Sequence, residues 1–193
     1  MSLIKYKITN NGRELGCFLV TTTYNEDVEV MEGEINLENI KQDIYVAVNQ
    51  KDYTLVKECI NSFVNEFRIS NIFSEIDSNS NIIFGMNNKI ERTYLFNNII
   101  FSNVYLISNL PKIFDRYSEG NNILKVYTIN SELRDIYPTT VKFITEDNEN
   151  ICFEILFPEN SICRYDKKNK ILKEYNCLNN ITKYELVSEE NVI

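Results

Sequence analysis

From about residue 81 to the end, the chain consists of short β-rich runs separated by turn-like clusters. The runs include IIFG, IERTYLF, ICFEILF, SICRYD and ITKYELV, and the clusters between them include GMNNK, TEDNEN and DKKN. β-Branched and aromatic residues favour strands, whereas Gly, Asn, Asp and Pro favour turns. This alternation predicts a mostly antiparallel sheet over residues 81–188.

The first third of the chain combines a hairpin signal with two helical patterns. Asn11 and Gly12 stand between two β-rich stretches, which predicts an antiparallel hairpin over residues 4–24. Behind Asn36, a good N-cap residue, apolar side chains recur at helical spacing. A wider apolar stripe follows from about 52 to 69 and predicts a second helix. We therefore expect a helical hairpin at about 36–69.

A further short helix is expected at about 109–118. Apolar residues between Leu110 and Tyr117 have helical spacing, Pro111 fits a first turn, and Gly120 fits a stop. The fold class predicted from these patterns is α+β, with a mostly antiparallel sheet, a helical hairpin and one short helix. The 193 residues suffice for one large core. We expect a single domain, 1–193, either undivided or with two lobes, 1–75 and 81–188.

The charge of the chain argues against two classes of partner. A net charge of −8 and a pI of about 4.8 disfavour binding to nucleic acids and to anionic membranes, which need clustered Lys and Arg. An acidic surface suits a basic protein partner, or it serves solubility alone. Because Ala47 is the only alanine among many Asn and Ile residues, we interpret the composition as that of an AT-rich genome.

The absence of histidine excludes several kinds of chemistry. Ser–His–Asp catalysis, Cys–His catalysis and histidine-based metal sites all need an imidazole. The five cysteines form no CxxC pair and no zinc-site spacing, so we expect reduced thiols and no metal. No apolar run reaches the length of a membrane span, and the first residues do not resemble a signal peptide. The chain is therefore expected to be cytoplasmic.

One carboxylate interrupts an apolar run in ICFEILFPENSICRY, residues 151–165. In a strand, Ile151, Phe153 and Ile155 would face one way, while Cys152 and Glu154 would face the other. Glu154 is then either a partly desolvated group at a cleft or a solvated residue at the rim of a sheet.

The run FEILFPENSICRY resembles the C-terminal catalytic strand of ADP-ribosyltransferases of the arginine–serine–glutamate class. The resemblance implies an NAD-consuming transferase in which Glu154 supports the transition state. Ser108, in VYLISNLPKIFDRY, would orient that glutamate from a strand, and Arg92, in KIERTYLF, would bind the phosphates of NAD. The usual Ser-Thr-Ser triplet is replaced here by Leu106, Ile107 and Ser108, and Cys152 stands two residues before the glutamate.

Three functional hypotheses follow. We favour a non-catalytic acidic binding protein that covers a surface of another protein, as a toxin-neutralising (immunity), inhibitory or host-factor-blocking protein would. This hypothesis rests on the missing catalytic residue types and on the Tyr-rich composition. The alternatives are an ADP-ribosyltransferase-like enzyme, intact or degenerate, that uses NAD, and a structural subunit of a viral or phage assembly. The favoured hypothesis requires no cofactor.

Overall fold

The structure is a computed structural model that describes residues 2–96, 98–131, 134–157, 160–178 and 182–191. The described residues form fifteen strands and one helix. In chain order, these are β1 (Ser2–Asn10), β2 (Arg13–Asn25), β3 (Val28–Leu37), β4 (Ile40–Asn49), β5 (Leu55–Val64), β6 (Phe67–Ile76), β7 (Asn81–Met86), β8 (Lys89–Leu95), β9 (Ile100–Ser102), α1 (Asn103–Tyr117), β10 (Ile123–Asn130), β11 (Asp135–Glu146), β12 (Asn150–Phe157), β13 (Ser161–Asp166), β14 (Leu172–Cys177) and β15 (Thr182–Asn191).

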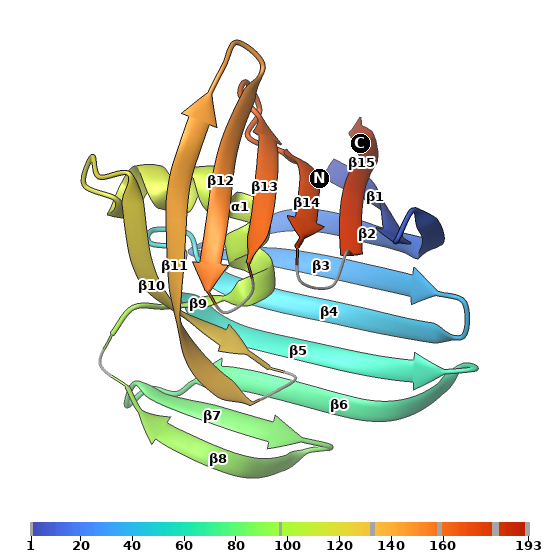
Figure 1. Cartoon of the computed structure of the whole chain (residues 1–193). Helices are drawn as coiled ribbons and strands as arrows, with labels where there is room; N and C mark the ends of the chain where they lie inside the picture. Colours follow the sequence, from blue (N-terminus) through green and yellow to red (C-terminus); the bar gives the residue numbers. More distant parts are fainter. Residues whose placement is uncertain (1, 97, 132–133, 158–159, 179–181, 192–193) are drawn as a thin grey trace.

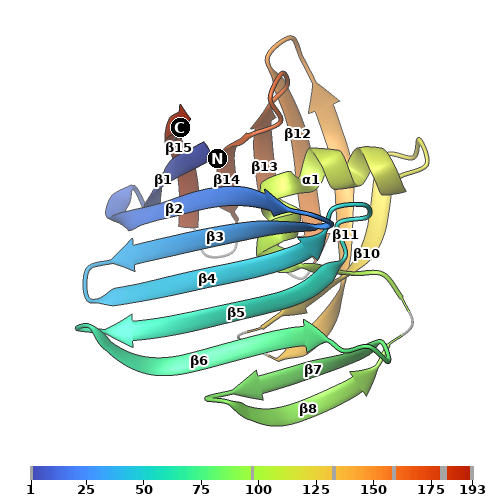
Figure 2. The same cartoon turned by 180° about the vertical axis from the view of Figure 1, so that it is seen from behind.

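All fifteen strands belong to one sheet with the order β8-β7-β6-β5-β4-β3-β2-β1-β15-β14-β13-β12-β11-β10-β9. Neighbouring strands pair antiparallel except β9 and β10, which are parallel and make the sheet mixed. Pairing of β1 with β15 joins the half made of β2–β8 to the half made of β10–β14 (Figure 1). The sheet also bends so that β9, at one end, lies close to β5. Helix α1 packs against β9, β10 and β14 (Figure 2).

Two-residue turns connect many of the early strands. The hairpin expected over residues 4–24 is confirmed: Asn10 pairs with Arg13, and the turn residues Asn11 and Gly12 have φ of 50° and 78°. The same left-handed pair recurs at residues 65–66, with φ of 48° and 70°, and at residues 87–88, with φ of 51° and 64°. Positive φ at both central residues is the requirement of a type I′ turn, whose twist matches that of the flanking strands.

The helical hairpin expected at about 36–69 is wrong, because this segment forms the end of β3, all of β4 and β5, and the start of β6. The apolar residues of β4 that suggested a helix are four residues apart, and an even spacing also keeps side chains on one face of a strand. Ile44 and Val46 are buried on either side of the exposed Tyr45, which is the alternation of a strand. The fold is therefore nearly all β, and the α+β assignment is also wrong.

A helix does lie where the short one was expected, although it is longer. Helix α1 begins at Asn103, is interrupted at Asn109 (φ −124°, ψ 20°), and continues to Tyr117. Its second half corresponds to the expected 109–118, with Pro111 at the start of that half. The first half occupies the run NVYLIS, which resembled a strand in the sequence. Ser102 caps this first half by accepting a hydrogen bond from the Tyr105 amide at 3.2 Å.

The core lies between the inner face of the sheet and α1. Leu106, Leu110 and Ile113 of the helix are fully buried. Phe153 of β12 lies with its ring 5.0 Å from that of Phe114 and 5.8 Å from that of Tyr165. Within the described part of the chain, no helix combines the length and the apolar character that crossing a membrane requires.

Candidate functional site

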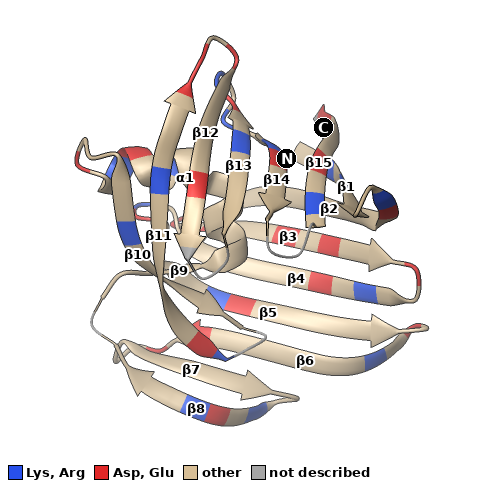
Figure 3. Cartoon of the chain, viewed as in Figure 1, with Lys and Arg blue, Asp and Glu red and all other residues tan. Residues whose placement is uncertain are grey.

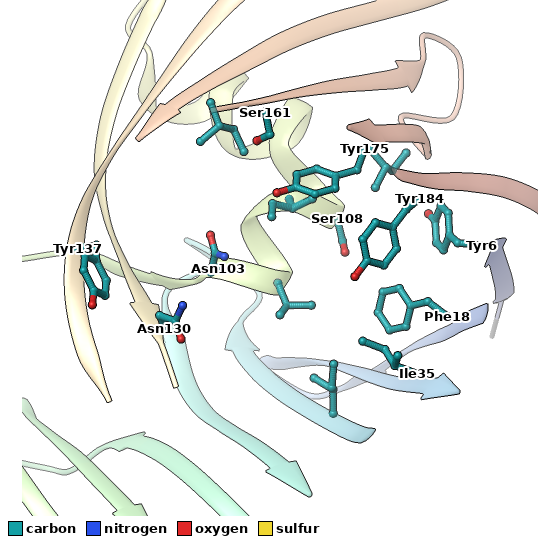
Figure 4. Close-up of a pocket in the computed structure, with 15 residues that line it drawn as sticks. Tyr6, Phe18, Ile35, Asn103, Ser108, Asn130, Tyr137, Ser161, Tyr175 and Tyr184 are labelled. Atoms are coloured by element: carbon teal, nitrogen blue, oxygen red, sulfur yellow. The ribbon is translucent and has the colours of Figure 1, made fainter. Parts of the chain in front are cut away.

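A cavity of about 470 Å³ lies between the first half of α1 and the concave face of the sheet (Figure 4). Strands from both halves of the sheet contribute to its wall. The apolar residues that line it are Phe18, Ile35, Ile44, Val104, Ile107, Ile155 and Leu172. The uncharged polar residues that line it are Tyr6, Asn103, Ser108, Asn130, Tyr137, Ser161, Tyr175 and Tyr184.

None of the described residues that line the cavity is charged, although a quarter of all residues in the chain are Asp, Glu, Lys or Arg. Asp, Glu, Lys and Arg residues occur instead at other positions along the strands and at several hairpin ends (Figure 3), and two of them, Glu29 and Glu58, are buried outside the lining of the cavity. Small-molecule sites are typically concave and mostly apolar, with a few polar groups that orient the ligand. The cavity likewise combines aliphatic and aromatic surface with uncharged amide and hydroxyl groups.

One part-buried hydrogen bond joins the helical wall of the cavity to the sheet. Pro111 has no amide hydrogen, so the carbonyl of Ile107, four residues earlier, receives no helical hydrogen bond from it. The hydroxyl of Tyr165, on β13, donates to the Ile107 oxygen at 2.5 Å. Burial keeps this hydroxyl protonated by raising the pKa of Tyr165 well above its ordinary value. The bond thereby ties the interrupted helix to the sheet beside the residues that line the cavity.

Four aromatic rings form a continuous chain along one end of the cavity (Figure 4). The rings of Tyr6 and Phe18 are 6.0 Å apart and stacked, and the ring of Tyr184 meets Phe18 edge-on at 6.3 Å. Tyr175 extends the chain, since its ring lies 5.7 Å from that of Tyr184 in an edge-to-face arrangement. Stacked and edge-to-face ring pairs stabilise a structure by more than the burial of their apolar surface alone provides. We call Tyr6, Phe18, Tyr175 and Tyr184 the aromatic cluster.

Gly33 of β3 provides the space that one ring of the aromatic cluster occupies. A Cβ atom at Gly33 would lie 2.7 Å from Cε2 of Phe18, which is closer than a carbon contact permits. The ring of Phe18 would have to move. The position of this ring therefore depends on the absence of a side chain at Gly33.

Two polar side chains of the helical wall are available to a ligand. Asn103 and Ser108 both line the cavity, and neither side chain makes a hydrogen bond within the described residues. Asn103 lies away from the aromatic cluster, near Asn130 (Figure 4). The cavity thus has an aromatic end and an end where amides are present.

The structure distributes the three residues of the transferase hypothesis over separate elements. Ser108 lies on α1, not on a strand, and lines the cavity. Glu154 is half-buried on β12, opposite Lys142 of β11, while its neighbour Ile155 faces the cavity. Arg92 is exposed on β8, the outermost strand at one end of the sheet, and lies 3.5 Å from the Tyr94 hydroxyl. No hydrogen bond or ion pair among the described residues joins any two of the three.

The strand alternation expected around Glu154 is present. Ile151, Phe153 and Ile155 are buried, whereas Cys152 and Glu154 are half-buried on the opposite face. This places Glu154 on the outer face of β12 and not in the wall of the cavity. The described residues also contain no group of three or more Cys, Asp or Glu arranged to hold a metal ion.

The aromatic cluster was not found from the sequence. Tyr6 and Phe18 belong to the first two strands, whereas Tyr175 and Tyr184 belong to the last two. They meet because β1 pairs with β15, and neither spacing nor composition predicts that pairing. The only available signal was the alternation of apolar residues within each strand. It indicates which side chains share one face of the strand, but it does not show which other residues pack against that face.

Comparison with known proteins identifies a similar fold and no function. No family model matches the chain, and no curated protein matches it. A solved structure of a DUF1089 family protein from Pseudomonas aeruginosa is similar, with a TM-score of 0.50 and 8% sequence identity. The similarity covers 82% of this chain and 88% of the other. At this identity the similarity concerns the fold alone.

Proposed function

We propose that the protein is a non-catalytic binding protein that holds a small molecule in the cavity beside α1. The observation that carries this proposal is the composition of the wall: aromatic, aliphatic and uncharged polar side chains, with no charged group among the described lining residues. Asn103 and Ser108 supply polar groups to orient a ligand. Binding without chemistry is favoured because the described wall offers no carboxylate, thiol, amine or imidazole that could activate its serine and tyrosine hydroxyls.

The test uses N-phenyl-1-naphthylamine, an uncharged dye whose fluorescence rises in apolar surroundings. We expect the unmodified protein to bind this dye at one saturable site. Val104→Trp and Ile155→Trp would place an indole in the cavity from its two sides and weaken binding by about tenfold or more. Ile155 is 3% exposed, so its substitution by the larger Trp strains the core. Val104→Trp therefore serves as a second blocking variant that does not depend on this buried position.

Leu156→Trp is the matched control. Leu156 follows Ile155 on β12 but faces outward and is 43% exposed, so it adds the same indole outside the cavity. Binding by the control should equal that of the unmodified protein. Failure of the dye to bind at one site, or equal binding by a folded Val104→Trp variant, would contradict the proposal.

The transferase alternative gains no support from this site. Of Ser108, Glu154 and Arg92, only Ser108 lines the cavity. We propose a cytoplasmic location, which the five free cysteines support, since thiols persist in reducing compartments.

Protein binding is a second candidate function, favoured by an exposed apolar segment at the start of β6. Phe67 is 77% exposed and Ile69 is 59% exposed. Pairing of β6 with β7 begins only at Ile72, so the described residues provide no β7 partner for this segment. An unpaired apolar edge can accept a strand from another protein.

The acidic net charge favours a basic protein as the partner. The test compares proteins retained from a lysate by the immobilised chain and by a Phe67→Ser, Ile69→Lys variant at low salt. Ile90→Ser, at an exposed residue on β8, is the control. A protein retained equally by all three chains, or no retained protein, would contradict this candidate.

A further inference from the structure

We infer that the ligand of the cavity is an uncharged molecule with a planar aromatic ring, which binds against the aromatic cluster. This inference rests on the proposed small-molecule function and adds the chemical class of the ligand. It is carried by the charge of the wall, by the geometry of the rings, and by the positions of the free polar side chains.

The first argument concerns charge. A charged ligand loses its hydration on entering a cavity, and opposite charges or several hydrogen bonds must replace that hydration. The described wall contains no Lys, Arg, Asp or Glu to provide such a partner. Burial also raises the pKa of Tyr6, so its hydroxyl stays neutral and cannot act as an anion toward a cationic ligand. The wall therefore favours an uncharged ligand over one that carries a phosphate, a carboxylate or a primary ammonium group.

The second argument concerns shape. Phe18 meets Tyr6 in a stacked pair and Tyr184 in a pair inclined by 80°, and all three residues line the cavity. A planar ring makes both stacked and edge-to-face contacts with such a group, whereas a saturated ring makes neither. Tyr175 and Tyr184 are only half-buried, which leaves ring surface available for a ligand to cover.

The third argument concerns the polar end of the ligand. Asn103 offers an amide and Ser108 a hydroxyl to the cavity, and neither is used within the described part of the chain. Both groups donate and accept hydrogen bonds without charge. They suit a neutral hydroxyl, carbonyl or ring nitrogen on a ligand whose ring lies in the aromatic cluster (Figure 4).

The test for charge compares N-phenyl-1-naphthylamine with 8-anilino-1-naphthalenesulfonate, which has the same ring skeleton and adds a sulfonate. We expect the sulfonate to bind at least about tenfold more weakly in the cavity, judged by the binding that Val104→Trp removes. Equal affinities of both dyes for the cavity would overturn the inference about charge. The proposed function would then stand, since the cavity would still bind both.

The test for the ring uses 2-naphthol and its saturated analogue decahydro-2-naphthol as competitors of N-phenyl-1-naphthylamine. We expect 2-naphthol to compete more strongly, and we expect Phe18→Leu to reduce the difference between the two. Phe67→Leu, at an exposed ring on β6, is the control and should preserve it. Equal competition by the two alcohols in the unmodified protein would overturn the inference about the ring.

Gly33→Ala gives an independent test that removes no ring. The added Cβ displaces the Phe18 ring, so the preference for 2-naphthol should fall while the protein remains folded. An unchanged preference in folded Gly33→Ala would contradict the role of the aromatic cluster. If N-phenyl-1-naphthylamine itself fails to bind the unmodified protein, the proposed function fails, and this inference fails with it.

Discussion

The hydrogen bond from Tyr165 to the Ile107 carbonyl makes a quantitative prediction about the stability of the fold. Tyr165→Phe removes the hydroxyl of a side chain that is 0% exposed and leaves the Ile107 carbonyl without this donor. An unsatisfied buried carbonyl costs about 1–3 kcal/mol. For a chain of this length, each kcal/mol lowers the melting temperature by about 2–4 °C. Urea unfolding of Tyr165→Phe should therefore show a free energy of unfolding lower by about 1–3 kcal/mol.

Pro111 provides a direct check of the cause. Pro111→Ala restores an amide hydrogen that can donate to the Ile107 carbonyl, which Pro111 cannot do. The loss caused by Tyr165→Phe should be smaller in the Pro111→Ala background than in the unmodified protein. A double-mutant cycle measures this difference.

Tyr117→Phe is the matched control for the hydroxyl. The Tyr117 hydroxyl also donates to a backbone carbonyl, that of Asp52, at 2.6 Å. Tyr117 is only half-buried, so water can replace its hydroxyl, and the loss should be smaller. The reasoning is refuted if Tyr165→Phe costs no more than Tyr117→Phe, or if the two substitutions in the cycle are additive.

Three further predictions concern packing, polar pairing and pH. Gly85→Ala should lower the free energy of unfolding by about 1–3 kcal/mol, because its Cβ would lie 2.2 Å from an aromatic carbon and 2.6 Å from a backbone oxygen. Gly120→Ala, which meets no atom within 4 Å and bears only the strain of φ +79°, should cost less in the same urea titration. Ser74→Ala should cost about 1–3 kcal/mol, because the Ser74 and Ser131 hydroxyls are 2.7 Å apart and buried, and adding Ser131→Ala should recover part of that loss. Burial raises the pKa of the Cys163 thiol to about 12, above the pKa of the same thiol in the unfolded chain. The contribution of the buried thiol to stability is therefore complete below about pH 8.5 and falls as pH rises toward 12. Unfolding free energies from pH 7 to 11 should decline less steeply in Cys163→Ala, and equal slopes would contradict this.

The turns show what a closer interpretation of the sequence could have provided. The Asn residues were attributed to genome composition, yet Asn11, Asn65, Asn87 and Asn88 all occupy left-handed turn positions. Asn adopts positive φ more readily than most residues, and two-residue turns need it. The turn at residues 11–12 was predicted from its Asn-Gly signal, and GMNNK, which contains Asn87 and Asn88, was interpreted as a turn-like cluster. The turn at residues 65–66 was missed because a helix was expected there.

The two helices expected at about 36–69 show a limit of periodicity. Ile40, Ile44 and Val48 fit both a helix and a strand because their spacing is four. The β-branched alternation through Ile44, Val46 and Val48 was the better guide, since Val and Ile favour strands. In α1 the error was the opposite one, because NVYLIS has strand-forming residues but is capped and packed as a helix.

The cavity could not be predicted in the same way. Its wall combines residues from the first four strands, α1 and the last six strands, so it exists only once β1 has paired with β15. Ser108 was singled out from the sequence for another role, and its position in the wall follows from the helix that replaced the expected strand. Glu154 drew attention because it interrupts an apolar run, but strand alternation turns it away from the cavity.

The most direct test of this account is a crystal structure of the protein with N-phenyl-1-naphthylamine at saturating concentration. We expect one dye molecule beside α1, with its rings in contact with Phe18 and Tyr184 and its amine directed toward Asn103 or Ser108. A dye bound only on an outer surface, such as that around Phe67, would contradict the account. The account would also be contradicted if the protein binds the dye in solution but the crystal structure shows no dye in the cavity.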